Sequence, residues 1–306
     1  MPFACIYVPN FSVAALLRAE PELHARAVAV LEGKPPLEKV FAANEKANCL
    51  GITPGMTKAQ AELCTELALR SRSPLQESSA HAALLDCAQS FSPCVEYAAA
   101  GTAILDLSGM ESLSGPLPGI ARSIFDRAAD LGIKANVAVA SNPDTALLAA
   151  SGFSGVTVIP DGKEAEQLSS LPIEVLFANQ YPGAEKKEAA RLLETLERWG
   201  VRNLRALAAL PEVALSERLG QEGLRLRQLA RGAASRTLVP MEAPLVFEEA
   251  VELEHAILLL EPLAFLLNRL LDQLCASLAS RALATQELRL TLELDNLRGM
   301  DCECEN

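Results

Sequence analysis

The sequence predicts a multidomain protein of the α/β (α+β) class, and three observations support this. Short apolar segments alternate with amphipathic helical patterns through residues 3–150, as in a sheet packed against helices. A helical region at 183–231 follows, and then a strand, helix and strand pattern at 247–294. With 306 residues, 50% of them hydrophobic, the chain can bury several compact cores.

One strand is expected at the centre of the first sheet. Residues 103–107 form a short apolar run ending in a Ser-Gly turn, and we expect this strand to pair with the one at 3–8, with helices covering one face. The other strands are expected at 27–31, 38–43 and 134–142, and the helices at 44–52, 58–64, 78–92, 119–131 and 143–150.

The second half of the chain is expected to be mostly helical. Within 183–231, a tight turn at Trp199-Gly200-Val201 closes one helix and Asn203 starts another, which predicts a helix-turn-helix pair. Strands are expected at 247–254 and 288–294, on either side of a helix with a leucine stripe.

The charge distribution restricts where nucleic acid could bind. The net charge is −12, yet residues 181–236 carry 11 Lys and Arg against 7 Glu, so this region is +4 and the remainder is −16. Affinity for DNA comes from neutralising phosphates, so this is the region we expect to face DNA. The alternative is that its arginines only solvate helix faces. The candidate DNA-binding residues are Arg198, Arg202, Arg205, Arg225, Arg227 and Arg231.

The sequence gives no sign of a membrane or metal protein. No uncharged apolar run approaches the roughly 20 residues of a membrane span, and the N-terminus lacks a secretory signal, so we expect a cytoplasmic protein. The eight cysteines are expected to be mostly buried free thiols. With three histidines and no CxxC pair, no metal site and no cofactor are expected.

Two motifs resemble the Y-family (translesion) DNA polymerases. Leu105-Asp106-Leu107-Ser108-Gly109 is similar to the family's palm motif, and Gly51, Met56, Ala59, Leu63 and Cys64 are similar to its fingers motif. The resemblance implies a right-hand architecture: palm at 1–30 and 75–165, fingers at 31–74, a helical thumb with a helix-hairpin-helix at 166–240, and a partial little finger at 244–306.

The resemblance also implies that the catalytic positions are degenerate. The family's metal-binding carboxylates fall on Tyr7 or Val8 in the first strand, and on Gly101 and Thr102 before the central strand. Two Mg²⁺ ions need several oxygen ligands, which these residues do not supply. The family binds the triphosphate with a tyrosine, an arginine and a lysine. In this sequence the three positions fall on Glu45, Asn48 and Leu147, respectively, so both cations are lost.

This combined loss is the pattern of the ImuB-type proteins, catalytically inactive Y-family relatives. The resemblance implies an adaptor in DNA repair and damage-induced mutagenesis that joins a C-family error-prone polymerase and a RecA-like accessory protein to the sliding clamp. Clamp binding is expected through a tail beyond residue 306, because the chain is expected to be a fragment of a longer protein.

Two alternatives remain. One is an active translesion polymerase that draws its carboxylates from Asp106 and Glu96, which lie several residues from the family's positions. The other is an unrelated α/β metabolic enzyme. The second is disfavoured because the chain lacks a nucleophile elbow, a glycine-rich phosphate loop and a cluster of histidines with acids.

Overall fold

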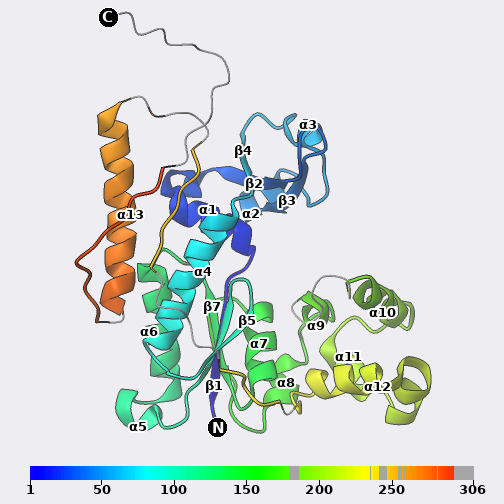
Figure 1. Ribbon diagram of the computed structural model, residues 1–306. Coiled ribbons are helices and arrows are strands. Elements are labelled where there is room, and N and C mark those ends of the chain that lie inside the picture. The colour runs from blue at the N-terminus through cyan, green and yellow to red at the C-terminus, as the bar shows by residue number, and fades with distance from the viewer. Residues whose placement is uncertain are drawn as a thin grey trace, which may run out of the picture.

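The first domain is built on a five-stranded sheet in the order β5-β6-β1-β7-β8 (Figure 1). The computed structural model describes residues 1–178, 186–234, 236–240, 247–253, 257, 259–280 and 282–292. The sheet consists of β1 (Phe3–Tyr7), β5 (Val95–Ala99), β6 (Thr102–Asp106), β7 (Asn136–Ala140) and β8 (Val156–Val158). Strand β1 is antiparallel to both β6 and β7, and β7 is parallel to β8. The expected pairing of the central strand with the first strand is therefore confirmed, and neither lies at an edge.

Helices cover both faces of this sheet, not the one face that the sequence predicts. Ala4, Ile6 and Leu105 point to one face and share a core with α4 (Pro74–Gln89) and α6 (Leu117–Asp130). Cys5 and Ile104 point to the other face and share a core with α7 (Pro143–Gly152). Strand β6 carries apolar side chains on both faces, with Ile104 on one and Ala103 and Leu105 on the other, so each face needs a helix layer to exclude water. A short helix, α5 (Glu111–Ser114), precedes α6.

The second sheet has three strands in the order β3-β2-β4. It consists of β2 (Ala27–Glu32), β3 (Lys39–Ala43) and β4 (Leu67–Ser71), with α1 (Phe11–Ala19), the 3-10 helix η1 (Pro21–Ala25), α2 (Glu45–Cys49) and α3 (Lys58–Ala61) around it. Strand β4 was not among the expected elements; it pairs with β2 in parallel. Both expected fingers helices are shorter than predicted.

The described part of the region expected as the thumb, 166–240, is helical and shares its core with the first sheet. It consists of α8 (Glu164–Leu168), α9 (Val175–Ala178), α10 (Lys186–Arg198), α11 (Leu204–Ala209) and α12 (Glu212–Ala230). Asn203 caps α11 by accepting a hydrogen bond from the Ala206 amide at 2.9 Å. Leu196 and Leu204 belong to the same core as α7, so the thumb is packed on the palm through buried leucines.

The last described helix, α13 (Leu260–Ser280), lies along α4 on the outer side of the palm (Figure 1). The strands expected on either side of it are not present in the described residues 247–253 and 288–292. Leu288, Leu290 and Leu292 are exposed. Alternating leucines form a strand only where a neighbouring strand supplies hydrogen bonds, and none lies beside these leucines in the described part of the chain. Residues 254, 293 and 294 lie outside the described residues.

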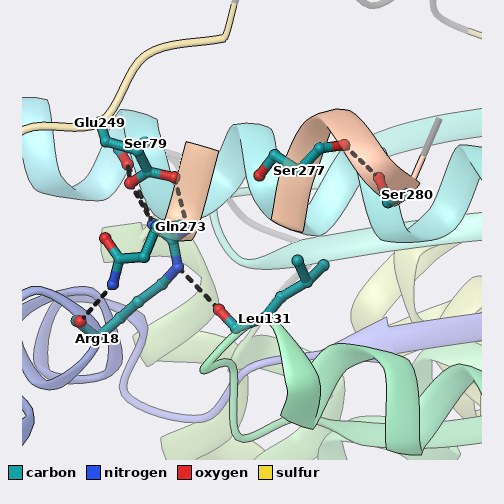
Figure 2. A network of polar contacts seen from close by, with 7 residues as sticks. All are labelled: Arg18, Ser79, Leu131, Glu249, Gln273, Ser277 and Ser280. Carbon is teal, nitrogen blue, oxygen red and sulfur yellow. Dashed lines mark hydrogen bonds and ion pairs between the residues drawn. The ribbon is translucent and has the colours of Figure 1, made fainter. Parts of the chain in front are cut away.

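A buried ion pair joins this C-terminal part to the palm (Figure 2). Arg18 of α1 donates two hydrogen bonds to the Glu249 carboxylate, at 2.6 and 2.7 Å, and the two side chains are 4% and 3% exposed. Arg18 also donates to the Leu131 carbonyl at 3.0 Å, and Ser79 of α4 donates to Glu249. Gln273 of α13 donates to the Arg18 carbonyl at 2.9 Å. Every nitrogen of the buried guanidinium group is thus directed at a partner from another element.

Two further expectations concern composition. None of the described helices is long and apolar enough to cross a membrane. The cysteines were expected to be mostly buried, but Cys49, Cys94 and Cys275 are exposed, whereas Cys5 and Cys87 are buried. The expectation was wrong for these three, which lie at the exposed end of α2, just before β5 and on an exposed side of α13. Cys302 and Cys304 lie outside the described residues.

Candidate functional site

The four palm positions singled out in the sequence lie together. Tyr7 and Thr102 are directly opposite each other across β1 and β6. The next residues along are joined as well, because the Val8 amide donates to the Gly101 carbonyl at 2.9 Å. The fold therefore brings two segments about 95 residues apart to one spot at the end of the central strands, although neither of them offers a carboxylate there.

Gly101 occupies a tight turn between β5 and β6 that only glycine fits easily. Its φ is +73°, in the left-handed region that L side chains rarely adopt. A Cβ atom at this position would lie 2.5 Å from the Phe11 ring. A side chain at Gly101, including an aspartate, therefore requires both backbone strain and a displaced Phe11.

Aromatic rings occupy the space beside this turn. The His81 ring from α4 lies 4.3 Å from the Tyr97 ring and contacts Phe11 edge-on at 6.2 Å, measured between ring centroids. Burial lowers the pKa of His81 to about 4, and neither of its ring nitrogens has a hydrogen-bond partner. The Thr102 hydroxyl is also buried without a partner. This group of rings supplies no carboxylate, the ligand that a divalent cation requires.

His81 and Phe11 were not singled out from the sequence. No motif marks them, because their neighbours in this cluster come from α1, α4 and β5, which are far apart in the chain. Their only common sequence feature is that each is an aromatic ring on a helix that packs near the palm sheet, which is true of many core residues.

The three nucleotide-binding positions are not brought to one surface. Glu45 and Asn48 are exposed on α2, beside the three-stranded sheet. Leu147 of α7 is buried in the core shared by palm and thumb. A lysine at the position of Leu147 would have to leave this core to reach a triphosphate.

The six thumb arginines separate into three pairs. Arg202 and Arg205 are exposed on the hairpin and form no ion pair with a carboxylate within the described residues; Arg205 donates to the Ser169 hydroxyl at 3.3 Å. Arg198 and Arg225 are exposed, and each pairs with a glutamate of its own helix. Arg227 is mostly buried against Glu212, and Arg231 donates twice to the Ala208 carbonyl. Five of the six arginines are therefore exposed, and Arg227 is the one whose side chain is largely buried.

The backbone amides of the hairpin are already hydrogen-bonded within the protein. The Gly200 and Val201 amides donate to carbonyls of α10, at 2.9 and 3.0 Å. The Leu204 and Arg205 amides donate to the carbonyls of Leu171 and Ser169, at 3.0 and 3.2 Å. These four amides are therefore not available to a phosphate.

The fold is similar to that of solved Y-family polymerases. A Y-family DNA polymerase chimera built on Dbh gives a TM-score of 0.64 at 19% identity, with 79% of this chain and 71% of that chain covered. DinB from Sulfolobus solfataricus gives 0.58 at 21% identity, with 78% and 69% covered.

Sequence relatives point the same way. Residues 6–151 match the impB/mucB/samB family. The chain is 31% identical over 246 residues to DNA polymerase IV of Dehalococcoides mccartyi (strain CBDB1), covering 78% of this chain and 60% of that protein. It is 26% identical over 190 residues to Protein ImuB of Caulobacter vibrioides (strain NA1000 / CB15N), covering 62% and 39%. This chain is a homologue of the Y-family DNA polymerases. The chain spans about 60% of the length of the first of these relatives. The homology removes the alternative of an unrelated α/β enzyme.

In this Y-family homologue the two acids considered as displaced metal ligands have other partners. Arg236 bridges Glu96 and Asp144, with N–O distances of 2.7 Å to each, and the Val239 amide donates to Glu96 at 2.8 Å. Asp106 accepts a hydrogen bond from the Ser108 amide at 2.8 Å. No group of three or more His, Cys, Asp or Glu residues suited to a metal ion occurs within the ranges that the structure describes.

Proposed function

We propose that this Y-family homologue is a non-catalytic adaptor in DNA repair and translesion synthesis. The observation that carries the proposal is the paired position of Tyr7 and Thr102, beside a Gly101 turn that Phe11 closes. Phosphoryl transfer by this fold class depends on Mg²⁺ ions held by carboxylates. Here Tyr7, Val8, Gly101 and Thr102 offer no carboxylate, and Glu96 and Asp144 are paired with Arg236, so the desolvation of an ion would be uncompensated.

The test is a pair of measurements on the purified chain. Primer extension with Mg²⁺ or Mn²⁺ is expected to give no product, and calorimetry is expected to give no micromolar dNTP binding in Mg²⁺. Mutating Glu96 to Gln distinguishes the adaptor from an active polymerase that uses displaced carboxylates. Such a polymerase would extend primers, and the variant would lose that activity. Extension by the wild-type chain would overturn the proposal.

We further propose that the thumb carries weak, sequence-independent binding of DNA. Support comes from the five exposed arginines in a region whose charge is +4 within an otherwise acidic chain. If about three or four phosphates are neutralised, log K should fall with log salt at a slope of roughly −3. Replacing Arg202 and Arg205 by Ala should reduce that slope by up to about two units.

Matched controls for this titration are the exposed fingers residues Lys34 and Lys39, whose replacement by Ala should leave the slope unchanged. The readout is fluorescence anisotropy of a labelled primer-template duplex across a salt series. Tight binding that ignores salt would show that the contact is not made through phosphates, and loss of binding in the fingers variants would place the DNA surface there.

The partners of the adaptor belong to the same proposal, which the likeness to ImuB supports. They are a C-family error-prone polymerase, a RecA-like accessory protein and the sliding clamp, with the clamp bound through a tail beyond residue 306. Analytical ultracentrifugation of this chain and of a longer protein that includes that tail, each with purified clamp, tests the last point. Clamp binding by residues 1–306 alone would move the contact into the described fold.

A further inference from the structure

The thumb hairpin presents an aromatic ring as well as arginines. Trp199 follows the last residue of α10 and is 36% exposed. The guanidinium carbon of Arg218, from the first turns of α12, lies 5.4 Å from the centroid of the Trp199 ring. Arg202 is on the same hairpin, three residues further on. An exposed indole with arginines around it is the composition of a surface that stacks unpaired bases and contacts their phosphates.

A second aromatic–arginine pair in the same chain shows what is particular to this one. In the fingers, Arg72 lies 4.2 Å from the centroid of the Phe41 ring, and Phe41 is 40% exposed. Arg72, however, is paired with both Glu32 and Glu77. Its charge is neutralised within the protein, so the fingers pair offers a ring without an available cation.

The thumb pair differs in its charge. Arg218 and Arg202 form no ion pair with a carboxylate in the part of the chain that the structure describes. Both side chains are exposed, and the whole region from 181 to 236 has an excess of four basic residues. An anionic ligand that brings an exposed π-face is complementary to this combination, and single-stranded nucleic acid is such a ligand.

The contact to the ring is what distinguishes single strands from duplex. Backbone amides of a helical hairpin can hold duplex phosphates, but here the amides of Gly200, Val201, Leu204 and Arg205 are bonded to protein carbonyls. Stacking on Trp199 needs an unstacked base, which a duplex does not expose.

We propose that Trp199, with Arg202 and Arg218, forms a stacking site for single-stranded nucleic acid on the thumb. This rests on the proposed DNA-binding role of the thumb and specifies its ligand. The site would accept bases of any sequence, because every base has a π-face.

The experiment uses the fact that Trp199 is the only tryptophan in the chain, so intrinsic fluorescence reports on this site alone. Addition of oligo(dT) to the full chain is expected to quench the emission, and a blunt duplex of the same length is expected to quench it much less. With fluorescein-labelled oligo(dT), Trp199→Ala is expected to weaken binding by about 5- to 100-fold, whereas Trp199→Phe, which keeps a ring, is expected to stay within about threefold of wild type.

Phe41→Ala is the matched control, because it removes an equally exposed ring that also lies under an arginine; its affinity for oligo(dT) is expected to be unchanged. Equal losses in Trp199→Phe and Trp199→Ala would overturn the stacking site, and so would equal affinities of Trp199→Ala and wild type. If duplex binding with the expected salt slope persists in that case, the thumb's DNA-binding role stands without the stacking site. If neither oligo(dT) nor duplex binds the wild-type chain, the DNA-binding role itself fails.

Discussion

Mutating Glu249 to Gln tests how the C-terminal part is held on the palm. The change keeps the size of the side chain but removes its charge, and it leaves the Arg18 guanidinium group buried at 4% exposure with no carboxylate opposite it. Removing one partner of a buried ion pair typically costs about 3–5 kcal/mol, mainly because the remaining charge stays desolvated. The bonds from Arg18 to Ser79 and to the Leu131 carbonyl remain, so we expect the lower end, about 3 kcal/mol.

This energy is expected to appear first as local opening of residues 247–253 and α13, since α13 packs against α4 and its Gln273 is bonded to Arg18, the partner of Glu249. The assay is amide hydrogen exchange of α13 read by mass spectrometry. A loss of about 3 kcal/mol corresponds to about a 150-fold faster opening-limited exchange in Glu249→Gln. Exchange in the palm strands β1 and β6 should remain unchanged.

The matched control is the exposed pair Arg122–Asp126 on α6, whose side chains are 64% and 55% exposed. Asp126→Asn should change stability by less than about 0.5 kcal/mol, because an exposed pair is screened by water. If Glu249→Gln and Asp126→Asn alter α13 exchange equally, the buried ion pair does not hold this helix.

Three further outcomes are expected. His81 has a pKa of about 4 in the folded protein against 6.5 in the unfolded chain, so between these pH values the unfolded state binds one more proton and stability falls as the pH drops. His81→Phe should make this fall shallower. NMR titration of His81 should show a midpoint near pH 4. Gly101→Asp should lower the free energy of unfolding, measured by urea denaturation, by roughly 1–3 kcal/mol from φ strain alone. Calorimetry should show that this variant does not bind Mg²⁺. Ala100→Asp, in the same turn, should leave the free energy of unfolding nearly unchanged. Arg236→Met should lower the urea midpoint by leaving Glu96 and a second carboxylate buried without a cation, and Arg236→Lys should lower it less.

Much of the fold follows from local patterns. The strands at 3–8, 27–31, 38–43 and 103–107 and the thumb hairpin are where alternation, apolar runs and the Asn203 cap place them, because each depends on residues close in sequence. Strand β4 was missed since Leu67 and Leu69 are too short a pattern to stand out. The strand expected at 288–294 fails in its described part for the opposite reason: the pattern is clear, but a strand also needs a partner.

The candidate site divides in the same way. The sequence alone shows that positions 7 and 101 carry no carboxylate, and that arginines are concentrated between residues 198 and 231. Their surroundings depend on elements that meet only in three dimensions. The structure alone brings Phe11 over Gly101, and it alone buries most of the Arg227 side chain while Arg202 and Arg205 stay exposed.

The primary structure thus determines which chemical groups the chain has available and the period with which they recur along each helix and strand. It does not determine which of those groups are neutralised, because ion pairs such as Arg18–Glu249 and Arg236–Glu96 join residues 231 and 140 positions apart. The energy of a charge depends on its burial and on the distance to its partner, and both are decided by the packing of the helices and sheets on one another.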